Sequence, residues 1–260
     1  MKISSLFEEL SRILQTGRKA ALCTLISKRG YGPREVGAKM LVDEEGRTLG
    51  TIGGSEMERT IIDEALKALR EGRPRSVSFA LGIEPKEGMI PLKSECGGTV
   101  EVFIDVIQPD PRLIIIGSGH IAKPLADLAH MVGFEVVIVD DAPTATRERF
   151  PYAEIHSGPF EEELDRLEVR ATDYVAIVHG ETPYELTALR KMLRKNPAYM
   201  GLLGSRHKVE RHKAKLREEG FTDDELKHIR GPIGIEIGAE TPEEIAVSIM
   251  AELIKVRRGH

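Results

Sequence analysis

The segment that most constrains the fold is residues 112–141, which read RLIIIGSGHIAKPLADLAHMVGFEVVIVDD. An apolar run ends at Gly117, and Gly117, Gly119 and Ala122 have the G-x-G-x-x-[GA] spacing at the start of a helical pattern. A second apolar run ends at Asp140, 21 residues after Gly119. A strand, a glycine turn, a helix and a second strand that ends in an acid together predict a Rossmann-like parallel sheet.

The residue types in this turn predict an anion site. Gly117 permits a tight turn, and Gly119 lets a phosphate approach the backbone. Free N–H groups at residues 118–121 and the helix dipole favour a negative charge there, and we expect His120 to contact the ligand. Asp140 is expected to accept hydrogen bonds from ribose hydroxyls and to repel a 2′-phosphate. The alternative is a glycine-rich turn that binds nothing.

Two later segments place polar groups at the same edge of the predicted sheet. His179 and Gly180 follow the apolar residues 174–178, and residues 204–206 follow the apolar residues 199–203. Because ligands of open α/β sheets bind at the carboxyl ends of the strands, both segments are candidates for the site. Two alternatives stay open: Ser205 is only a helix N-cap, and His179 is a loop histidine with its own partners.

The best domain boundary lies at Pro109 and Pro111, because two prolines close together interrupt both helix and sheet. We therefore expect an N-terminal α+β domain over residues 1–108 and a Rossmann-like domain over 112–260. The first half is predicted to contain helices at 3–14 and 55–71 and strands at 20–27, 39–42, 47–52, 76–80 and 99–107. Ser55 and Glu58 have capping-box spacing at the second helix, as Thr241 and Glu244 have at the last one.

Composition excludes several functional classes. Of the 260 residues, 41% are hydrophobic and 30% charged, which is ordinary for a globular protein. The net charge of −5 has both signs interleaved, so we expect no nucleic-acid partner. No apolar run is long enough to cross a bilayer and the first residues do not form a signal peptide, so we expect no membrane contact and a cytoplasmic location. Two cysteines form neither a disulfide framework nor a zinc site.

Several segments together resemble the XdhC/CoxI family, the accessory factors of molybdenum hydroxylases such as xanthine dehydrogenase. They occur in family order and span nearly the whole chain. The matching stretches are residues 32–34 with 37–42, 50–54 with Glu58, 96–98 with 100–103, 117–122, Asp140 with Asp141, 199–206 as YMGLLGSR, and 232–234 with 238–252.

The resemblance implies a non-catalytic maturation chaperone. Such a protein binds molybdopterin or a molybdopterin dinucleotide and assists the sulfuration of this cofactor and its insertion into the apo-enzyme of a molybdenum hydroxylase. A cysteine desulfurase is the expected sulfur source, and the protein is expected to be a homo-oligomer. Two positions depart from the family pattern. Glu56 replaces a usual cysteine, and Gly180, Glu181 and Tyr184 replace a glycine-histidine pair that is followed by an acid.

The N-terminal candidates are expected to face the Rossmann edge across a cleft between the domains, because glycine loops and fixed cations suit an anionic ligand. The alternatives are that Arg34 and Lys39 form solvated ion pairs and that Cys96 is a packing residue. The residues predicted to bind the cofactor are Gly117, Ser118, Gly119, His120, Ile121, Asp140, Asp141, His179, Gly180, Gly204, Ser205 and Arg206 in the second half and Arg34, Lys39, Gly53, Gly54 and Cys96 in the first.

Two other functions remain open on the sequence. The glycine turn and Asp140 also fit an NAD-dependent oxidoreductase, although no Tyr-x-x-x-Lys pair or other proton-transfer constellation stands out. A regulatory nucleotide sensor, in which the N-terminal domain binds a protein, is the third possibility.

Overall fold

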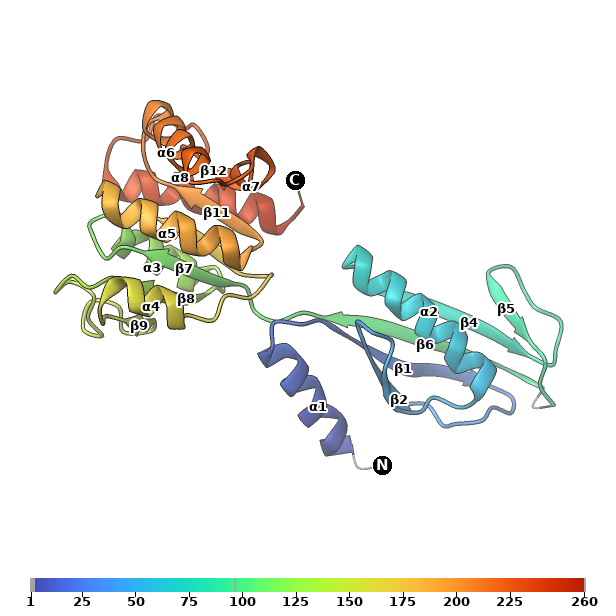
Figure 1. Ribbon diagram of the computed structural model, residues 1–260. Coiled ribbons are helices and arrows are strands. Elements are labelled where there is room, and N and C mark those ends of the chain that lie inside the picture. Colours follow the sequence, from blue (N-terminus) through green and yellow to red (C-terminus); the bar gives the residue numbers. More distant parts are fainter. Residues whose placement is uncertain (1–2, 96, 260) are drawn as a thin grey trace. The chain divides into compact units, whose positions relative to one another are not determined.

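A computed structural model describes residues 3–95 and 97–259 of the chain. The chain divides into two compact units, Met1–Pro109 and Asp110–His260 (Figure 1). Each unit has apolar cores of its own. Within the described residues, no helix is long and apolar enough to cross a membrane.

The N-terminal unit is a six-stranded sheet with one helix on each face. The strand order is β3-β2-β1-β6-β4-β5, and every pair is antiparallel except β4 with β5. The elements are α1 (Ile3–Gln15), β1 (Ala20–Arg29), β2 (Lys39–Asp43), β3 (Thr48–Gly50), α2 (Ser55–Glu71), β4 (Arg75–Leu81), β5 (Met89–Leu92) and β6 (Gly98–Ile107).

Alternation along β1 explains why both faces of this sheet are covered. Ala21, Cys23 and Leu25 pack in the core with α2, whereas Ala20 packs with Leu6 and other residues of α1. Because successive side chains of a strand point to opposite faces, one strand supplies residues to both cores. Figure 1 shows α1 and α2 on opposite sides of the sheet.

The start of α2 differs from the prediction. The N-cap is Gly54 and no side chain caps the helix, so the expectation that Ser55 is the N-cap of a capping box was wrong. The Glu58 carboxylate instead reaches back to the turn before the helix, where it accepts hydrogen bonds from the Thr51 hydroxyl at 2.5 Å and the Gly53 amide at 3.3 Å. Glu58 therefore fixes the glycine turn that precedes α2.

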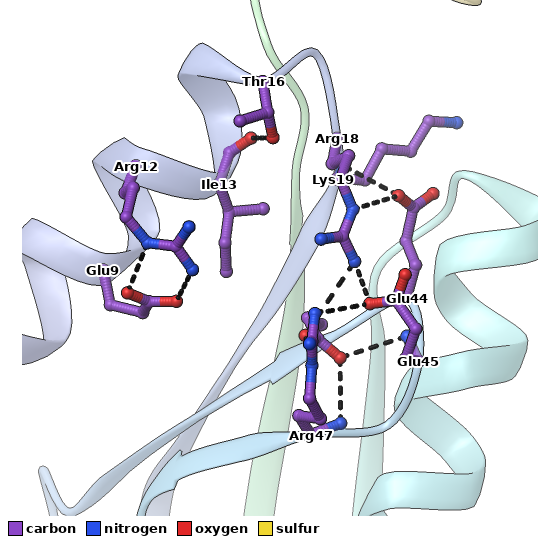
Figure 2. A network of polar contacts seen from close by, with 10 residues as sticks. Glu9, Arg12, Ile13, Thr16, Arg18, Lys19, Glu44, Glu45 and Arg47 are labelled. Atoms are coloured by element: carbon purple, nitrogen blue, oxygen red, sulfur yellow. Dashed lines mark hydrogen bonds and ion pairs between the residues drawn. The ribbon is translucent and has the colours of Figure 1, made fainter.

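A surface network joins the connection between α1 and β1 to the β2–β3 hairpin (Figure 2). Arg18, in that connection, forms ion pairs with Glu44 and Glu45 of the hairpin turn. Within the hairpin, Asp43 accepts hydrogen bonds from the amide of Arg47 at 2.8 Å and from its Nε at 2.7 Å. The network therefore links two connections on the surface of this unit, the one between α1 and β1 and the one between β2 and β3.

The C-terminal unit contains a six-stranded, fully parallel sheet in the order β12-β11-β10-β7-β8-β9. This confirms the predicted Rossmann-like fold. The elements are β7 (Arg112–Ile116), α3 (Ala122–Met131), β8 (Glu135–Val139), β9 (Glu154–His156), α4 (Phe160–Arg166), β10 (Tyr174–Ile177), α5 (Thr182–Lys195), β11 (Tyr199–Leu202), α6 (Arg206–Glu218), α7 (Asp223–Leu226), β12 (Ile229–Arg230) and α8 (Pro242–Arg257).

Two apolar cores flank this sheet. Residues of α3 and α8 form one core with Leu113 and Ile115 of β7, and residues of α4, α5 and α6 form the other with Ile114 and Ile116. β7 is buried on both faces, which is why its sequence is continuously apolar. At the start of α8, Thr241 and Glu244 form the predicted capping box.

Candidate functional site

The site lies where the strand order of the parallel sheet reverses, between β7 and β10. The loops that follow these two strands touch there. A Cβ atom on Gly117, whose φ is +114°, would lie 2.8 Å from the Cα atom of His179. Only a glycine allows this close approach and this backbone conformation. The two loops therefore meet at the position where open α/β sheets bind their ligands.

The glycine turn after β7 is open toward solvent. Gly119 and His120 are exposed, and a Cβ atom on Gly119 would meet no atom within 4 Å. The helix that follows has Ile121 as its N-cap and no side-chain cap. Arg149 donates a hydrogen bond to the Gly119 carbonyl at 3.1 Å, which places a cation at the turn. Uncapped amides, an open approach and a nearby cation together suit a phosphate group.

Asp140 closes the underside of this turn. Its Oδ2 atom accepts hydrogen bonds from the Ser118 amide at 2.6 Å and hydroxyl at 2.7 Å, and its Oδ1 atom accepts one from the Ala142 amide at 3.2 Å. Only 3% of Asp140 is exposed, and Ser118 is fully buried. The carboxylate therefore shapes the turn, while its contact with a ribose stays a prediction.

The charges of Asp140 and His179 stabilise one another. Burial alone would raise the pKa of Asp140, but hydrogen bonds from His179 and Ser118 outweigh this effect and lower it to about 2. Burial would likewise lower the pKa of His179, but the hydrogen bond and the charge of Asp140 raise it. The His179 Nε2 and Asp140 Oδ1 atoms lie 3.5 Å apart. His179 thus has a partner within the fold, as the alternative interpretation proposed.

An aromatic cluster holds His179 in place. The Tyr184 ring stacks on the His179 ring with centroids 4.1 Å apart, and Phe160 packs edge-on against both. The Tyr184 hydroxyl donates a hydrogen bond to Asp141 at 3.3 Å. Tyr184 was noted in the sequence only as a departure from the family pattern. Its position shows that it links α5 to the acid pair that follows β8.

A buried ion cluster ties the loops after β10 and β11 together. The Lys208 ammonium donates hydrogen bonds to the fully buried Glu185 at 2.6 Å and to the Gly180 carbonyl at 3.4 Å. The His212 Nε2 atom lies 3.0 Å from the other Glu185 oxygen. Ser205 is the N-cap of α6 and accepts a hydrogen bond from the Lys208 amide at 3.2 Å, so its predicted capping role is confirmed.

A cavity of about 540 Å³ begins beside the glycine turn. Ile121 lines it, as do Gly204 in the loop after β11 and Arg206, the first residue of α6. Further lining comes from the irregular segment 232–239, for which the sequence had indicated no ligand contact. The Rossmann candidates thus group around two adjoining features, the glycine turn and this cavity.

Among the N-terminal candidates, Arg34 lies in the loop between β1 and β2, Lys39 begins β2, and Gly53 and Gly54 precede α2. Arg34 and Lys39 line a pocket of about 290 Å³, and the Lys39 ammonium donates a hydrogen bond to the Thr24 hydroxyl at 3.3 Å. A Cβ atom on Gly53 would clash with Pro33, whereas one on Gly54 would meet nothing. That these loops face the Rossmann edge stays a prediction.

Lys28 is the partner of Glu35, at 2.5 Å, and no ion pair of Arg34 occurs among residues 3–95 and 97–259. Cys96 lies outside the described residues. Cys23 is buried in the N-terminal core, and burial raises the pKa of its thiol to about 12. In the part of the chain that the structure describes, no cluster of three or more His, Cys, Asp or Glu side chains suits a metal ion.

Comparison with known families identifies both halves of the chain. Residues 113–253 match the family model described as the XdhC Rossmann domain, and residues 13–80 match that of the XdhC and CoxI family. The chain belongs to the XdhC/CoxI family. The resemblance found in the sequence is thereby confirmed.

Curated relatives share this similarity over nearly the whole chain or a large part of it. The chain is 35% identical over 258 residues to the uncharacterized protein YqeB of Escherichia coli (strain K12), and the match covers 98% of the chain and 47% of YqeB. It is 35% identical over 162 residues to a probable xanthine dehydrogenase subunit of Bacillus subtilis (strain 168), with 62% of the chain and 47% of that protein covered. The chain thus spans about half the length of these two relatives.

A third relative and one solved structure agree with this family. The molybdenum cofactor insertion chaperone PaoD of Escherichia coli (strain K12) is 25% identical over 290 residues, which cover 94% of the chain and 85% of PaoD. A crystal structure described as a xanthine dehydrogenase from Bacillus halodurans has the same fold, with a TM-score of 0.53, 24% identity and coverage of 97% and 96% of the two chains.

Proposed function

We propose that this XdhC/CoxI protein is a chaperone that binds the molybdenum cofactor, as molybdopterin or a molybdopterin dinucleotide, and assists its insertion into a molybdenum hydroxylase such as xanthine dehydrogenase. The main support is the open glycine turn at Gly119, which lies where the strand order of the XdhC Rossmann domain reverses. The names of PaoD and of the Bacillus subtilis relative supply the client class.

The turn fits the phosphate of such a cofactor. The free space above Gly119 admits a phosphate to the backbone, and the uncapped start of α3 offers amide donors. Asp140 holds Ser118 in place below, so the turn is pre-organised before the ligand arrives. Asp141 is exposed beside Asp140 and is a second acceptor within reach of a ribose. When bound, the cofactor supplies the molybdenum centre to the client enzyme, while this chain binds and orients it.

Transfer of sulfur requires a reactive cysteine, and the described residues contain no accessible one. Cys23 is buried with a raised pKa, and Glu56 occupies the position of the usual family cysteine. A carboxylate neither carries sulfur nor acts as a soft ligand for molybdenum. We therefore assign any sulfur transfer to Cys96, with a cysteine desulfurase as the partner and a homo-oligomer as the acting form.

The direct test is anaerobic binding of molybdopterin by the purified protein, followed through pterin fluorescence and molybdenum content. Wild-type protein is expected to retain the cofactor, and Gly119→Val is expected to lose it, because a branched side chain fills the space of the phosphate. The variant should unfold at the same denaturant concentration as wild type, since no neighbour lies within 4 Å of the added Cβ atom. Retention of the cofactor by a folded Gly119→Val protein would overturn the placement of the site.

NAD serves as the competing ligand in the same assay. An oxidoreductase would bind NAD in preference to molybdopterin and transfer a hydride, which absorbance at the wavelength of the reduced nicotinamide detects. The proposed chaperone shows neither behaviour, and it raises the activity of a co-expressed molybdenum hydroxylase. A Cys96→Ser variant that binds cofactor normally but fails to support the sulfurated enzyme would identify the sulfur carrier.

A further inference from the structure

The cavity beside the glycine turn has walls that are fixed before any ligand binds. The Ile233 amide donates a hydrogen bond to the Leu202 carbonyl at 3.0 Å, and the Gly234 amide donates one to Glu252 of α8 at 2.5 Å. The Ser248 hydroxyl donates to the Ile235 carbonyl at 2.5 Å. This irregular segment is therefore held against β11 and α8, and the cavity is pre-formed, as small-molecule sites usually are.

The same segment exposes two large apolar side chains. Ile235 is 38% exposed and Ile237 is 49% exposed, and both line the cavity. Ile121, at the start of α3, and Leu203, after β11, add apolar side chains to the lining. Apolar side chains that gather around a volume of about 540 Å³ suit a flat ring system, which gains from burial between them.

Two charged side chains complete the lining. Glu236 has one oxygen that accepts a hydrogen bond from the Gly238 amide at 3.1 Å, and its other oxygen has no partner among the described residues. Arg206 is exposed and forms no ion pair or side-chain hydrogen bond within residues 3–95 and 97–259. A carboxylate only accepts hydrogen bonds and a guanidinium only donates them, so the cavity presents both kinds of group to a ligand.

We infer that this cavity binds the heterocyclic ring of the ligand whose phosphate lies on the glycine turn, and that the ring carries an amino group beside a ring N–H and a carbonyl. The 2-amino-4-oxopyrimidine edge of a pterin or a guanine has this pattern. Glu236 accepts from the two adjacent N–H donors, and Arg206 donates to the carbonyl oxygen. Ile121 belongs to both the turn and the cavity, so one ligand of this size reaches both.

This inference rests on the proposed function, because it assigns the ring subsite of the same ligand. Three probes separate the ring subsite from the proposed function: molybdopterin, GMP and AMP. AMP has a phosphate and a purine but lacks the amino-carbonyl edge. Affinities are measured by anaerobic titration on the full chain. Ile237→Asp and Glu236→Gln are expected to weaken molybdopterin and GMP by about tenfold or more and to leave the weak binding of AMP unchanged.

The matched control is Val247→Asp on α8. Val247 is 49% exposed, as Ile237 is, but it does not line the cavity. The control should bind molybdopterin as wild type does, and all three variants should unfold at similar denaturant concentrations.

Each outcome separates the two proposals. Molybdopterin binding that Ile237→Asp and Glu236→Gln do not weaken overturns the ring subsite and leaves the proposed function in place. Binding of GMP but not molybdopterin by wild type supports the ring subsite and overturns the proposed function. If the wild-type protein binds neither molybdopterin nor GMP, the ring subsite and the proposed function are both overturned.

Discussion

The two units of the chain place their charges in different surroundings. In each described ion pair of the N-terminal unit, at least one partner is partly or fully exposed, as the Arg18 network shows. Asp43 of the N-terminal unit is buried, but the side chains of its partners Arg18 and Arg47 are 31% and 67% exposed. In the C-terminal unit, buried carboxylates have partners with largely buried side chains at both edges of the sheet: Asp173 pairs with Arg112 at the amino edge, and Asp140 and Glu185 pair with His179 and His212 at the carboxyl edge. Both units otherwise have the same number of strands and apolar cores on both faces.

Exposed and buried ion pairs have different effects on stability and geometry. A surface pair contributes little to stability, because water and salt screen it. A buried charge is costly unless it is paired, so it persists where it fixes a particular geometry. In the C-terminal unit, the buried charges at the carboxyl edge, Asp140 and Glu185, fix the loops around the candidate site. In the N-terminal unit the ion pairs join surface elements, and the predicted site residues Arg34 and Lys39 lie outside those pairs.

The largest expected effect is the loss of the buried pair at the amino edge. Asp173 accepts two hydrogen bonds from the Arg112 guanidinium, at 2.7 and 3.2 Å, and one from the Arg170 amide at 2.8 Å. The Asp173 and Arg112 side chains are 1% and 10% exposed. Asp173→Ala leaves a buried cation without its partner, and the free energy of unfolding should fall by about 3 to 5 kcal/mol, measured by urea titration.

The double variant Arg112→Met with Asp173→Leu is the control for this prediction. It removes both charges, so its loss should be much smaller than that of Asp173→Ala alone. A single variant that costs less than about 1 kcal/mol would show that the buried pair behaves as a surface pair does.

The second effect comes from the two glycines of the turn, which have opposite roles. Gly117→Ala should cost roughly 2 to 4 kcal/mol, because its φ of +114° is unfavourable for alanine and the added carbon would lie 2.8 and 2.9 Å from the His179 backbone. Gly119→Ala has open space and should cost less than about 1 kcal/mol. Thermal unfolding of the two variants separates a glycine required by the fold from one available to the ligand. Equal losses would contradict the distinction.

The third effect is a pH dependence of the carboxyl edge. The pKa of Asp140 is lowered from 3.8 to about 2, so its stabilising contribution is fully present above about pH 4 and is lost as the pH falls toward 2. The contribution amounts to about 2 kcal/mol. Asp140→Asn should be less stable than wild type at pH 7, and the difference should shrink between pH 4 and 2 in denaturant titrations.

Asp141→Asn removes the exposed carboxyl group next to Asp140 and is the matched control for this pH profile. His179 has the opposite pH dependence. Its pKa is raised by Asp140, so its contribution is present below its ordinary pKa and is lost as the pH rises through the raised value. A wild-type profile that is flat below pH 4 would contradict the buried Asp140 contact.

The sequence predicted the elements that have strong local signals. The glycine spacing and continuous apolar runs located β7, α3 and β8, and the last helix was marked by its capping box. The short strands β5, β9 and β12 were missed, because they have two to four residues and pair with one neighbour at a sheet edge. β5 also contains Pro91, a residue that is unfavourable in a central strand but tolerated in an edge strand such as β5.

The candidate site was predictable only in part, because its decisive contacts are distant in sequence. The pattern located Asp140 at the end of a strand but not the contact with His179, 39 residues away. Local propensity likewise did not predict that Glu58 reaches back to Thr51. Ile235 and Ile237 lie in a segment without helix or strand, so no periodicity marked them as cavity walls.

The smallest expected effect tests the surface network of the N-terminal unit (Figure 2). Arg18 is 31% exposed and pairs with Glu44 and Glu45, and its guanidinium lies 3.9 Å from Asp43. Arg18→Met keeps the apolar stem and removes the charge, and it should cost at most about 1 kcal/mol in low salt. Asp43 keeps its bonds from the Glu45 and Arg47 amides, so no buried carboxylate is left alone.

In about 1 M salt the Debye length falls to roughly 3 Å, and the difference between Arg18→Met and wild type should nearly vanish in urea titrations. This salt response separates the two units, because the cost of Asp173→Ala should persist at the same salt concentration, where its partner Arg112 is buried. A cost above about 2 kcal/mol for Arg18→Met that persists in high salt would mean that Arg18 compensates the buried charge of Asp43. The N-terminal unit would then stabilise a buried charge in the same way as the C-terminal unit, and the contrast between them would fail.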